Sequence, residues 1–469
     1  MSFLLKDKTQ LRRVQVAAIG ASTGESLRLL ISPRMSQPMD SAEQPFWRRA
    51  SEIMRVGAFR RYILGSAISD TGTWMQVMAQ GWVMSTLTNR GFYLGLAAAA
   101  AGIPTILLAM KGGEAADRYD KRKILIWTQI VQIILALALG YLVLIGRIQI
   151  WHVIVLALCL GTCIAFEMPA INALVPELVT KDQIATAIAL DRSVFHGSRL
   201  VGPSVAGIFV GWWGAASAFF TNAFTFLALI AALATLPART IGTAEEEEQR
   251  KSGFKEGLIY VRKDRTILAM IVLIGLSTIF VFPFLSTMLP LYVRNVLQLG
   301  PTQMGYLMAV SGSGSLLGAL GLLSVPRHLR FRFMTFAVIT VGLALCAMSR
   351  STSFVLSAIS MGILAIGMSS NFGLASTIVQ ERAPSPLRGR ISAIFGLSFF
   401  GLTPIGSLIT PAFADLIGLR TAFVIGGILY ATCAVIVLAF AGRVGCEETR
   451  RAAVAEPAAE PETAPVAAH

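Results

Sequence analysis

Residues 112–123 read GGEAADRYDKRK and lie between two long apolar runs of the chain, 92–111 and 123–146. Seven of these twelve residues are charged, whereas charged residues make up only 14% of the 469-residue sequence. Crossing the hydrocarbon core of a membrane takes roughly 20 apolar residues in a helix. We therefore expect this stretch to be a short turn at a membrane surface, between two helices that span the bilayer.

The rest of the chain follows the same pattern. Hydrophobic residues make up 55% of the sequence and its mean hydropathy is +0.67, whereas soluble domains are less apolar and carry more charge. Long apolar runs favour helices, because a helix satisfies its own backbone hydrogen bonds in lipid. The sequence predicts an all-α integral membrane protein with twelve transmembrane helices, at 60–87, 92–111, 123–146, 150–175, 187–211, 215–236, 266–293, 303–325, 331–349, 353–378, 389–412 and 416–441.

Lysine and arginine are distributed unequally between the two sets of loops. The short loops on the side of the N-terminus contain 13 of them, at 111–123, 181, 192, 327–332 and 382–390. Five loops on the other side contain one each, at Arg90, Arg147, Arg294, Arg350 and Arg420. The positive-inside rule places the rich side in the cytoplasm, where basic residues meet anionic lipids. We expect both termini to be cytoplasmic, and the net charge of +14 to serve membrane topology instead of nucleic-acid binding.

The sequence also repeats itself at a spacing of 204 residues. GPSVAGIFVGWWGAASAF at 202–219 aligns without a gap with GSLITPAFADLIGLRTAF at 406–423. Two six-helix halves that start on the same side are parallel repeats, and their substrate site is expected near the membrane midplane between them. The predicted parts are a disordered cytoplasmic extension (1–58, starting at Met1, Met35 or Met39), two bundles (59–236 and 266–441), a cytoplasmic linker (237–265) and a disordered cytoplasmic tail (442–469).

The charged turn carries a spaced motif that points to a known family. Gly113, Asp117, Arg118, Lys121 and Arg122 resemble the helix 2–3 signature of the major facilitator superfamily. The similarity is closer to its transmembrane secretion effector branch, which includes the enterobactin exporter and many efflux permeases. The segments that carry it are Gly72–Gln76, Glu167–Ala170, Arg199–Pro203, Phe220–Ala223, Gly257–Tyr260 and Leu387–Arg390. The resemblance covers residues 58–440 and implies two six-helix bundles that transport by alternating access.

The resemblance also implies roles for single residues. Asp117 is expected to lock the inner gate while the carrier faces outward, by contacting the start of helix 11. Relatives often have Arg where Ile171 stands, so Arg388, Arg390 or the helix terminus is the expected partner. Gly113 is expected to allow close helix contact, and Arg118 and Arg122 complete the gating motif, although the loop also fits a purely topological role. Gly202, Pro203 and Gly207 partly match the antiporter signature of helix 5, which favours export.

Three ionisable side chains lie well within predicted spans, where burial of each costs at least about 3 kcal/mol. Asp70 belongs to a polar stripe with Ser66, Thr73 and Gln80 along one helix face. Glu167 and Arg199 lie at similar depths in consecutive helices, so we expect them to pair. In a functional reading, Asp70 or Glu167 binds and releases a proton. In a structural reading, Glu167 and Arg199 form a permanent pair.

Other side chains are weaker candidates for lining a substrate cavity. They are polar or aromatic residues of several predicted spans: Trp74, Gln76, Asn222, Phe280, Phe284, Asn371, Phe399 and Thr403. The four histidines are scattered, and the sequence contains no phosphate-binding loop or nucleophile–base arrangement. We therefore expect neither an enzyme nor an ATP-driven pump, and no cofactor or metal.

These features predict a secondary active transporter of the inner (plasma) membrane that acts as a monomer. We expect it to export a hydrophobic or amphipathic small molecule, such as a drug, a siderophore or another secondary metabolite, in exchange for protons. The main alternative is a lipid or lysophospholipid flippase, or an importer, on the same fold. A non-transporting membrane scaffold is a distant alternative, since the chain has only short tails.

Overall fold

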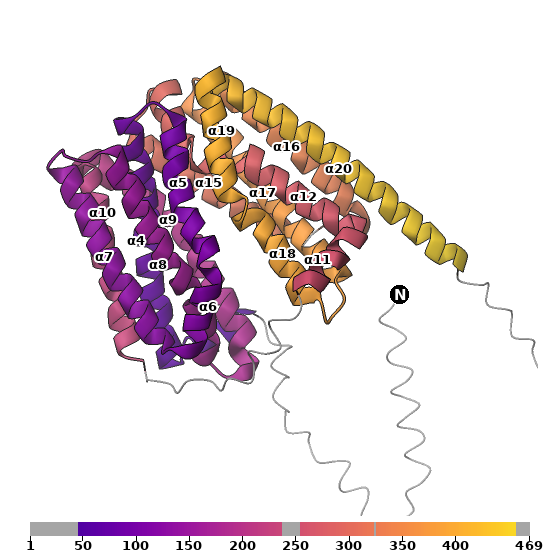
Figure 1. Ribbon diagram of the computed structural model, residues 1–469, viewed down its shortest axis with the longest axis horizontal. Coiled ribbons are helices and arrows are strands. Elements are labelled where there is room, and N and C mark those ends of the chain that lie inside the picture. The colour runs from indigo at the N-terminus through magenta and orange to yellow at the C-terminus, as the bar shows by residue number, and fades with distance from the viewer. Residues whose placement is uncertain (1–45, 237–253, 323–324, 456–469) are drawn as a thin grey trace, which may run out of the picture. The chain divides into compact units, whose positions relative to one another are not determined.

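The computed structural model describes residues 46–236, 254–322 and 325–455 (Figure 1). In this part of the chain every regular element is helical. Predictions for residues 1–45, for most of the linker and for the last residues of the tail lie outside the described residues. The region preceding the first predicted bundle contains the helix α3 (Phe46–Ile53), so residues 46–53 are helical where disorder was expected.

The N-terminal half comprises helices α4 to α10. They are α4 (Gly57–Leu87), α5 (Gly91–Leu107), α6 (Ala109–Arg118), α7 (Lys121–Leu144), α8 (Ile150–Glu177), the short turn η1 (Lys181–Gln183), α9 (Ile184–Trp213) and α10 (Ala215–Ala234). Within this half α4 packs against α9 and α10, α7 against α8 and α10, and α5 against α8.

The C-terminal half is reached through α11 (Phe254–Lys263), which occupies part of the predicted linker. It comprises α12 (Arg265–Phe280), α13 (Phe282–Ser286), α14 (Leu289–Leu291), η3 (Tyr292–Val296), α15 (Pro301–Gly321), η5 (Arg327–Leu329), α16 (Arg330–Arg350), α17 (Phe354–Arg382), α18 (Arg388–Phe400), α19 (Thr403–Ile417) and α20 (Leu419–Ala455). The last helix continues past its predicted end at 441, so residues 442–455 are helical where disorder was expected.

Three predicted spans consist of broken helices. The second span bends by 51° between α5 and α6 at Leu108, where Pro104 lies in the preceding turn. The seventh span breaks at Val281 and the eleventh at residues 401–402. A proline removes a backbone donor and its ring displaces the preceding carbonyl, so the first bend has a local cause.

A helix occupies each of the twelve predicted runs, but fewer of them have the length and hydropathy of a membrane span. Eight helices of the described residues meet both criteria, or nine if α5 and α6 form one bent span. The three that fall short are α4, α9 and α15. Ionisable side chains such as Asp70 and Arg199 lower the hydropathy of the first two, and Ser and Gly lower that of α15. The count of twelve spans therefore stays a prediction.

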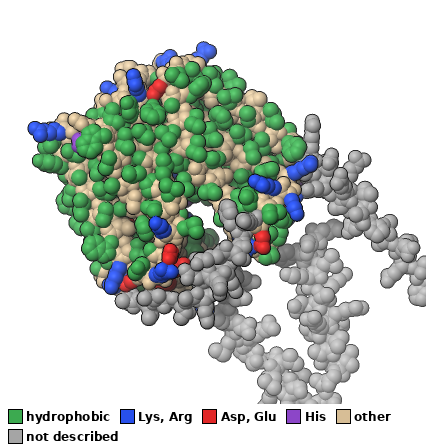
Figure 2. Space-filling model, in the orientation of Figure 1, with side chains coloured by type: hydrophobic (Ala, Val, Ile, Leu, Met, Phe, Trp, Pro, Cys, Tyr) green, Lys and Arg blue, Asp and Glu red, His purple; other side chains and the backbone are tan. Residues whose placement is uncertain are grey.

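The surface agrees with a bilayer environment. Figure 2 shows one face on which hydrophobic side chains cover the middle and Lys and Arg gather towards the two ends. Large apolar side chains such as Leu107, Trp127 and Phe224 are 66% to 72% exposed. We call the end with the loops 111–123, 327–332 and 382–390 the basic end, and the other end the opposite end.

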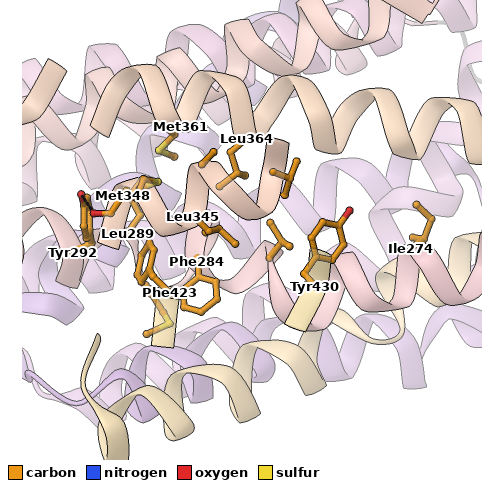
Figure 3. Packing of buried hydrophobic residues seen from close by; sticks show 14 of the residues in the cluster. Ile274, Phe284, Leu289, Tyr292, Leu345, Met348, Met361, Leu364, Phe423 and Tyr430 are labelled. Atoms are coloured by element: carbon orange, nitrogen blue, oxygen red, sulfur yellow. Dashed lines mark hydrogen bonds between the residues drawn. The ribbon is translucent and has the colours of Figure 1, made fainter. Parts of the chain in front are cut away.

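The core of the C-terminal half contains aromatic rings in tilted contact among aliphatic side chains (Figure 3). The ring of Phe423 lies 4.5 Å from that of Phe284 and 5.3 Å from that of Tyr292, centre to centre. The Tyr292 hydroxyl donates a 2.8 Å hydrogen bond to the Met348 carbonyl, which satisfies the polar atom of this buried ring. These contacts hold the start of α20 and the broken seventh span in one rigid unit.

The repeat seen in the sequence recurs as matching local structure. Gly214 and Gly418, 204 residues apart, end α9 and α19 with φ angles of +80° and +90°, which favour glycine. A Cβ on Gly202 would lie 2.6 Å from the Thr71 carbonyl oxygen of α4, and one on Gly406 would lie 2.7 Å from the Thr278 carbonyl oxygen of α12. The contact of the fifth span with the first, through Gly202, is therefore equivalent to the contact of the eleventh span with the seventh, through Gly406.

Two helix pairs make most of the contact between the halves, and α4 makes smaller contacts with α14 and α15. On one side α5 meets α19, where a Cβ on Gly95 would lie 2.0 Å from the Ser407 carbonyl oxygen. On the other side α9 meets α15, where the Cα atom of Gly207 would lie 3.0 Å from a Cβ on Gly305. Both close approaches lie in the parts of these helices nearer the opposite end.

Candidate transport site

The polar stripe on α4 starts a network of side chains inside the N-terminal half. The buried Ser66 hydroxyl donates a 3.0 Å hydrogen bond to the Asp70 carboxylate, which is itself only partly exposed. One turn further, the Thr73 hydroxyl donates to the Ser69 carbonyl at 3.0 Å, and Gln80 is partly buried. The stripe therefore faces protein and not lipid, as its cost in lipid requires.

Glu167 of α8 is held by two glutamines of α7. The side-chain amides of Gln129 and Gln132 donate to its two carboxylate oxygens at 2.8 and 2.6 Å. The Ser69 hydroxyl of α4 in turn donates to the Gln129 carbonyl oxygen at 3.3 Å. Amide donors stabilise a carboxylate without adding a charge, so two uncharged side chains fix the position of the Glu167 carboxylate.

The expected pair of Glu167 and Arg199 is wrong for this conformation. The Arg199 guanidinium lies over the Trp74 ring, with its Cζ 5.3 Å from the ring centre, and Phe195 stacks edge-on against the same ring. A cation over the face of an indole ring is electrostatically favourable. Arg199 is therefore held by an aromatic ring of α4, because the rotation of α9 turns it towards α4 and away from α8.

A third carboxylate, which the sequence motifs do not single out, lies near Asp70. Asp191 of α9 is 8% exposed and accepts a 3.0 Å hydrogen bond from the Tyr62 hydroxyl. Tyr62, Ser66 and Asp70 follow one another at intervals of four on α4 and so share one face. Asp70 is close enough to interact electrostatically with both Asp191 and Glu167. The four-residue spacing of Tyr62 from Ser66 was the available signal, but Asp191 lies too near the start of the predicted span 187–211 to stand out as a charge inside the membrane.

The C-terminal half replaces these acids with neutral or aromatic residues. The positions 204 residues after Asp70, Glu167 and Asp191 are Ile274, Asn371 and Phe395. Phe395 belongs to a ring cluster of α13, α17 and α18. Its members are Phe282, Phe372, Phe395, Phe399 and Phe400, with neighbouring ring centres 5.2 to 5.6 Å apart. Charge is therefore concentrated in one half and aromatic surface in the other.

Several predicted cavity residues are instead buried in helix packing in this conformation. The Asn222 amide donates to the Gln76 carbonyl oxygen at 2.8 Å, which joins α10 to α4. Both residues are at most 4% exposed. Phe284 is 1% exposed in the aromatic core, and Asn371 is fully buried beside Tyr430. Phe280 and Thr403 stay partly exposed, with the Thr403 hydroxyl bonded to the Phe399 carbonyl.

The gating motif at the basic end is engaged within single halves. Arg118 pairs with Glu114 at 2.9 Å, and Arg122 donates to the Leu236 carbonyl. Arg390 pairs at 2.6 Å with Glu256, which precedes the C-terminal half, and Arg388 is exposed. Arg390, one of the partners expected for Asp117 in an outward-facing carrier, thus pairs with Glu256 in this conformation.

The close helix contact expected at Gly113 is made by the preceding residue. A Cβ on Gly112 would lie 2.0 Å from the Ala165 carbonyl oxygen of α8, whereas nothing lies within 4 Å of the corresponding point on Gly113. The register of α6 turns Gly112 towards α8, because the bend at Leu108 rotates α6 relative to α5.

The helix 5 motif lies where α9 touches both α4 and the other half. Gly202 packs on α4 as described above, and Pro203 is buried inside α9. Its carbonyl oxygen would lie 2.4 Å from a Cβ on Gly305, and Gly207 faces the same glycine of α15. The small residues of this motif therefore allow the two halves to approach closely.

Polar contacts between the halves gather at the opposite end. The Asp415 carboxylate of α19 accepts hydrogen bonds from the backbone N–H groups of Gly91 and Phe92, at 2.6 and 2.9 Å. Arg294 donates to the Ser85 carbonyl and, at 3.2 Å, to the Asn89 side chain. At the end that holds α6 and α11, the surface is open between the halves (Figure 2). The protein is thus closed at the opposite end and open at the basic end.

Comparisons with known proteins agree with this architecture. A family model described as transmembrane secretion effector matches residues 51–466. The multidrug efflux pump Tap of Mycolicibacterium fortuitum is 23% identical over 370 residues, which are 77% of this chain and 90% of that protein. Macrolide efflux protein A of Streptococcus pyogenes is 22% identical over 379 residues, 79% of this chain and 93% of that protein.

Solved structures show the same fold at low identity. The nucleoside transporter NupG superposes with a TM-score of 0.64 at 12% identity, over 82% of this chain and 98% of that one. A bacterial homologue of the iron transporter ferroportin, in an inward-facing state, gives 0.62 at 16% identity, over 83% and 98%. With a matching family model over most of its length, the chain belongs to the transmembrane secretion effector family of the major facilitator superfamily.

Proposed function

We propose that this protein is a proton-coupled exporter of hydrophobic or amphipathic small molecules. The observation that carries the proposal is the group of three buried or half-buried acids, Asp70, Glu167 and Asp191, which lies in one half of a two-half carrier. Burial favours the neutral form of a carboxyl group, so such groups bind and release protons when their access to water changes. The relatives named as efflux pumps support export as the direction.

The positions of the acids suggest how coupling proceeds. With the basic end taken as cytoplasmic, the present conformation opens towards the cytoplasm. Asp70 or Glu167 loses its proton there, and the carrier binds its substrate. After the halves rock about their contacts, the same acids meet the external solution, take up a proton and release the substrate. Each cycle then exports one substrate molecule in exchange for the one or more protons that enter.

The aromatic cluster of the C-terminal half suggests the class of substrate. Phe372 and Phe400 are 37% and 65% exposed, and Phe399 lies between them in the cluster. Flat apolar rings bind apolar surface and add stacking with ring-containing ligands. The N-terminal half supplies carboxylates and a cation, and together the two halves suit a molecule with both apolar and polar parts.

Transport in proteoliposomes tests the proposal. Purified full-length protein is reconstituted, a pH gradient is imposed, and movement of a fluorescent lipophilic dye and of a macrolide is followed. We expect gradient-driven movement that an uncoupler abolishes. Movement that ignores both the gradient and the uncoupler would refute proton coupling, and transbilayer movement of labelled phospholipid alone would favour a flippase.

Matched variants assign the acids. Asp70→Asn and Glu167→Gln should abolish gradient-driven movement but leave exchange of labelled for unlabelled substrate, which requires no net proton transfer. Glu381→Gln serves as the control, because Glu381 forms its ion pairs with Arg327 and Arg330 at the basic end, away from the network. Full gradient-driven activity in both acid variants would remove these residues from the mechanism.

A further inference from the structure

The start of α5 is capped by the other half of the protein. The first N–H groups of a helix have no partner within the helix and are usually satisfied by the side chain that precedes it. Arg90 precedes α5 and supplies no such bond. Asp415, near the end of α19, instead accepts from the N–H groups of both Gly91 and Phe92, at 2.6 and 2.9 Å. A carboxylate is well suited to this place, because the helix start carries partial positive charge.

The surroundings of this contact leave little room for a side chain. A Cβ on Gly91 would lie 3.1 Å from Pro411, one turn before Asp415, and 3.3 Å from the Asp415 carboxylate. Gly91 therefore lets the backbone of α5 reach the carboxylate directly. The cap depends on contact between the halves at the opposite end, where they must part if the carrier is to open on that side.

We propose that Asp415 is the gating residue that holds the opposite end closed. Its two bonds exist while the halves touch there, and they break in each cycle when that end opens. Arg294 strengthens the same closure from the C-terminal half by binding Ser85 and Asn89 at the end of α4. The inference goes beyond the proposed function, since it requires neither a proton gradient nor a particular substrate.

The connection to the basic end follows from the direction of the helices. The α5–α6 span starts at the opposite end and reaches Asp117 at the basic end, whereas the α18–α19 span starts at the basic end and reaches Asp415 at the opposite end. Each of these antiparallel spans thus carries an aspartate near its end, and in this conformation Asp415 lies beside the start of the other span. If Asp117 contacts the start of α18 in the outward-facing state, as the family resemblance implies, the two caps alternate, each holding one end closed.

Distances between spin labels on the full-length protein test the proposal. One pair, at Arg147 and Thr352, reports the opposite end, and a second pair, at Lys123 and His328, reports the basic end; all four positions are exposed. Native cysteines are first replaced by serine, and the protein is measured in nanodiscs without substrate. Removal of a charge-assisted cap should shift the ratio of the two conformations by about tenfold or more.

We expect Asp415→Ala to lengthen the opposite-end distance and shorten the basic-end distance. Asp415→Asn keeps the volume and one acceptor, and it should give a smaller shift in the same direction. Asp264→Ala is the control, because Asp264 caps α12 with bonds of 2.9 and 3.0 Å to Thr266 and Ile267 and pairs with Arg382 at 3.1 Å, all inside one half. Wild-type distance distributions in both folded Asp415 variants would overturn the proposal, as would an equal shift in the control.

The outcome is separable from that of the proposed function. Transport that is independent of the pH gradient would refute proton coupling but would not contradict the proposed gating role of Asp415. Unchanged spin-label distances in the Asp415 variants, together with normal gradient-driven transport, would refute the gating role of Asp415 but would leave proton coupling supported.

Discussion

Replacement of Gly95 by alanine should force the carrier out of the conformation described here. A Cβ at this position would lie 2.0 Å from the Ser407 carbonyl oxygen, across the contact between α5 and α19. Ordinary contact between a methyl group and an oxygen requires more than 3 Å, so the two helices must separate by about 1 Å. This contact joins the two halves, and only the conformation that is closed at the opposite end needs it.

The size of the effect follows from the cost of overpacking. An inserted methyl group in a close-packed contact costs about 1–3 kcal/mol. If the other conformation opens this contact, the whole cost falls on the closed one, and the ratio of the two changes by a factor of about 5 to 150. We expect Gly95→Ala to populate the conformation open at the opposite end and to slow transport.

A second glycine offers a control of the same geometry. A Cβ on Gly161 of α8 would lie 2.0 Å from the Ala101 carbonyl oxygen of α5, but this contact joins helices of one half. Gly161→Ala should therefore lower the thermal stability of the protein and leave the conformational ratio unchanged, because both conformations bear the same cost.

Two measurements check the pair. The spin-label distances at the two ends report the conformational ratio, and thermal unfolding in detergent reports stability. We expect Gly95→Ala to shift the distances and Gly161→Ala to shift only the unfolding temperature. If Gly161→Ala shifts the distances as much as Gly95→Ala, or if neither shifts them, the reasoning that the α5–α19 contact closes the opposite end is refuted.

Three further changes have expected outcomes. Asp191→Asn should lower gradient-driven transport about tenfold or more while substrate exchange persists, because a carboxylate in the network becomes neutral. Proteoliposome assays of both gradient-driven transport and exchange check this. Equal loss of both activities would point to a structural role for Asp191. Arg294→Ala should favour opening of the opposite end by about 1–3 kcal/mol, because the Ser85 carbonyl loses a charged donor; unchanged opposite-end spin-label distances would contradict it. Phe399→Ala should weaken binding of ring-containing substrates by about 0.5–1.5 kcal/mol, because stacking with the ligand is lost. Binding is measured by titration with fluorescence quenching. Phe336→Ala, on the apolar exterior, is the control and should leave binding unchanged.

Properties set by local sequence could be predicted well. Long apolar runs force helices in lipid, so a helix lies in each predicted run, and the 204-residue repeat recurs at Gly214 and Gly418. The family followed from motifs that are contiguous in the chain. Helix breaks inside the second, seventh and eleventh spans were missed, because a run of apolar residues looks the same whether its helix is straight or bent.

Contacts between helices could not be predicted with the same success. Glu167 and Arg199 were expected to pair from their depth alone, but depth says nothing about the rotation of each helix about its axis. Rotation turns Glu167 towards the glutamines of α7 and Arg199 towards Trp74. For the same reason Gly112, and not Gly113, makes the close contact with α8.

The amino-acid sequence by itself thus determined the helices, their repeat, the basic side and the family, because hydrophobicity and spacing act along the chain. Only the tertiary structure decided which acids share a network, which aromatic residues remain exposed, and that Asp415 caps a helix of the other half. Those contacts depend on how separate helices rotate and on which end of the carrier is closed, and neither is encoded in the spacing of residues within one helix.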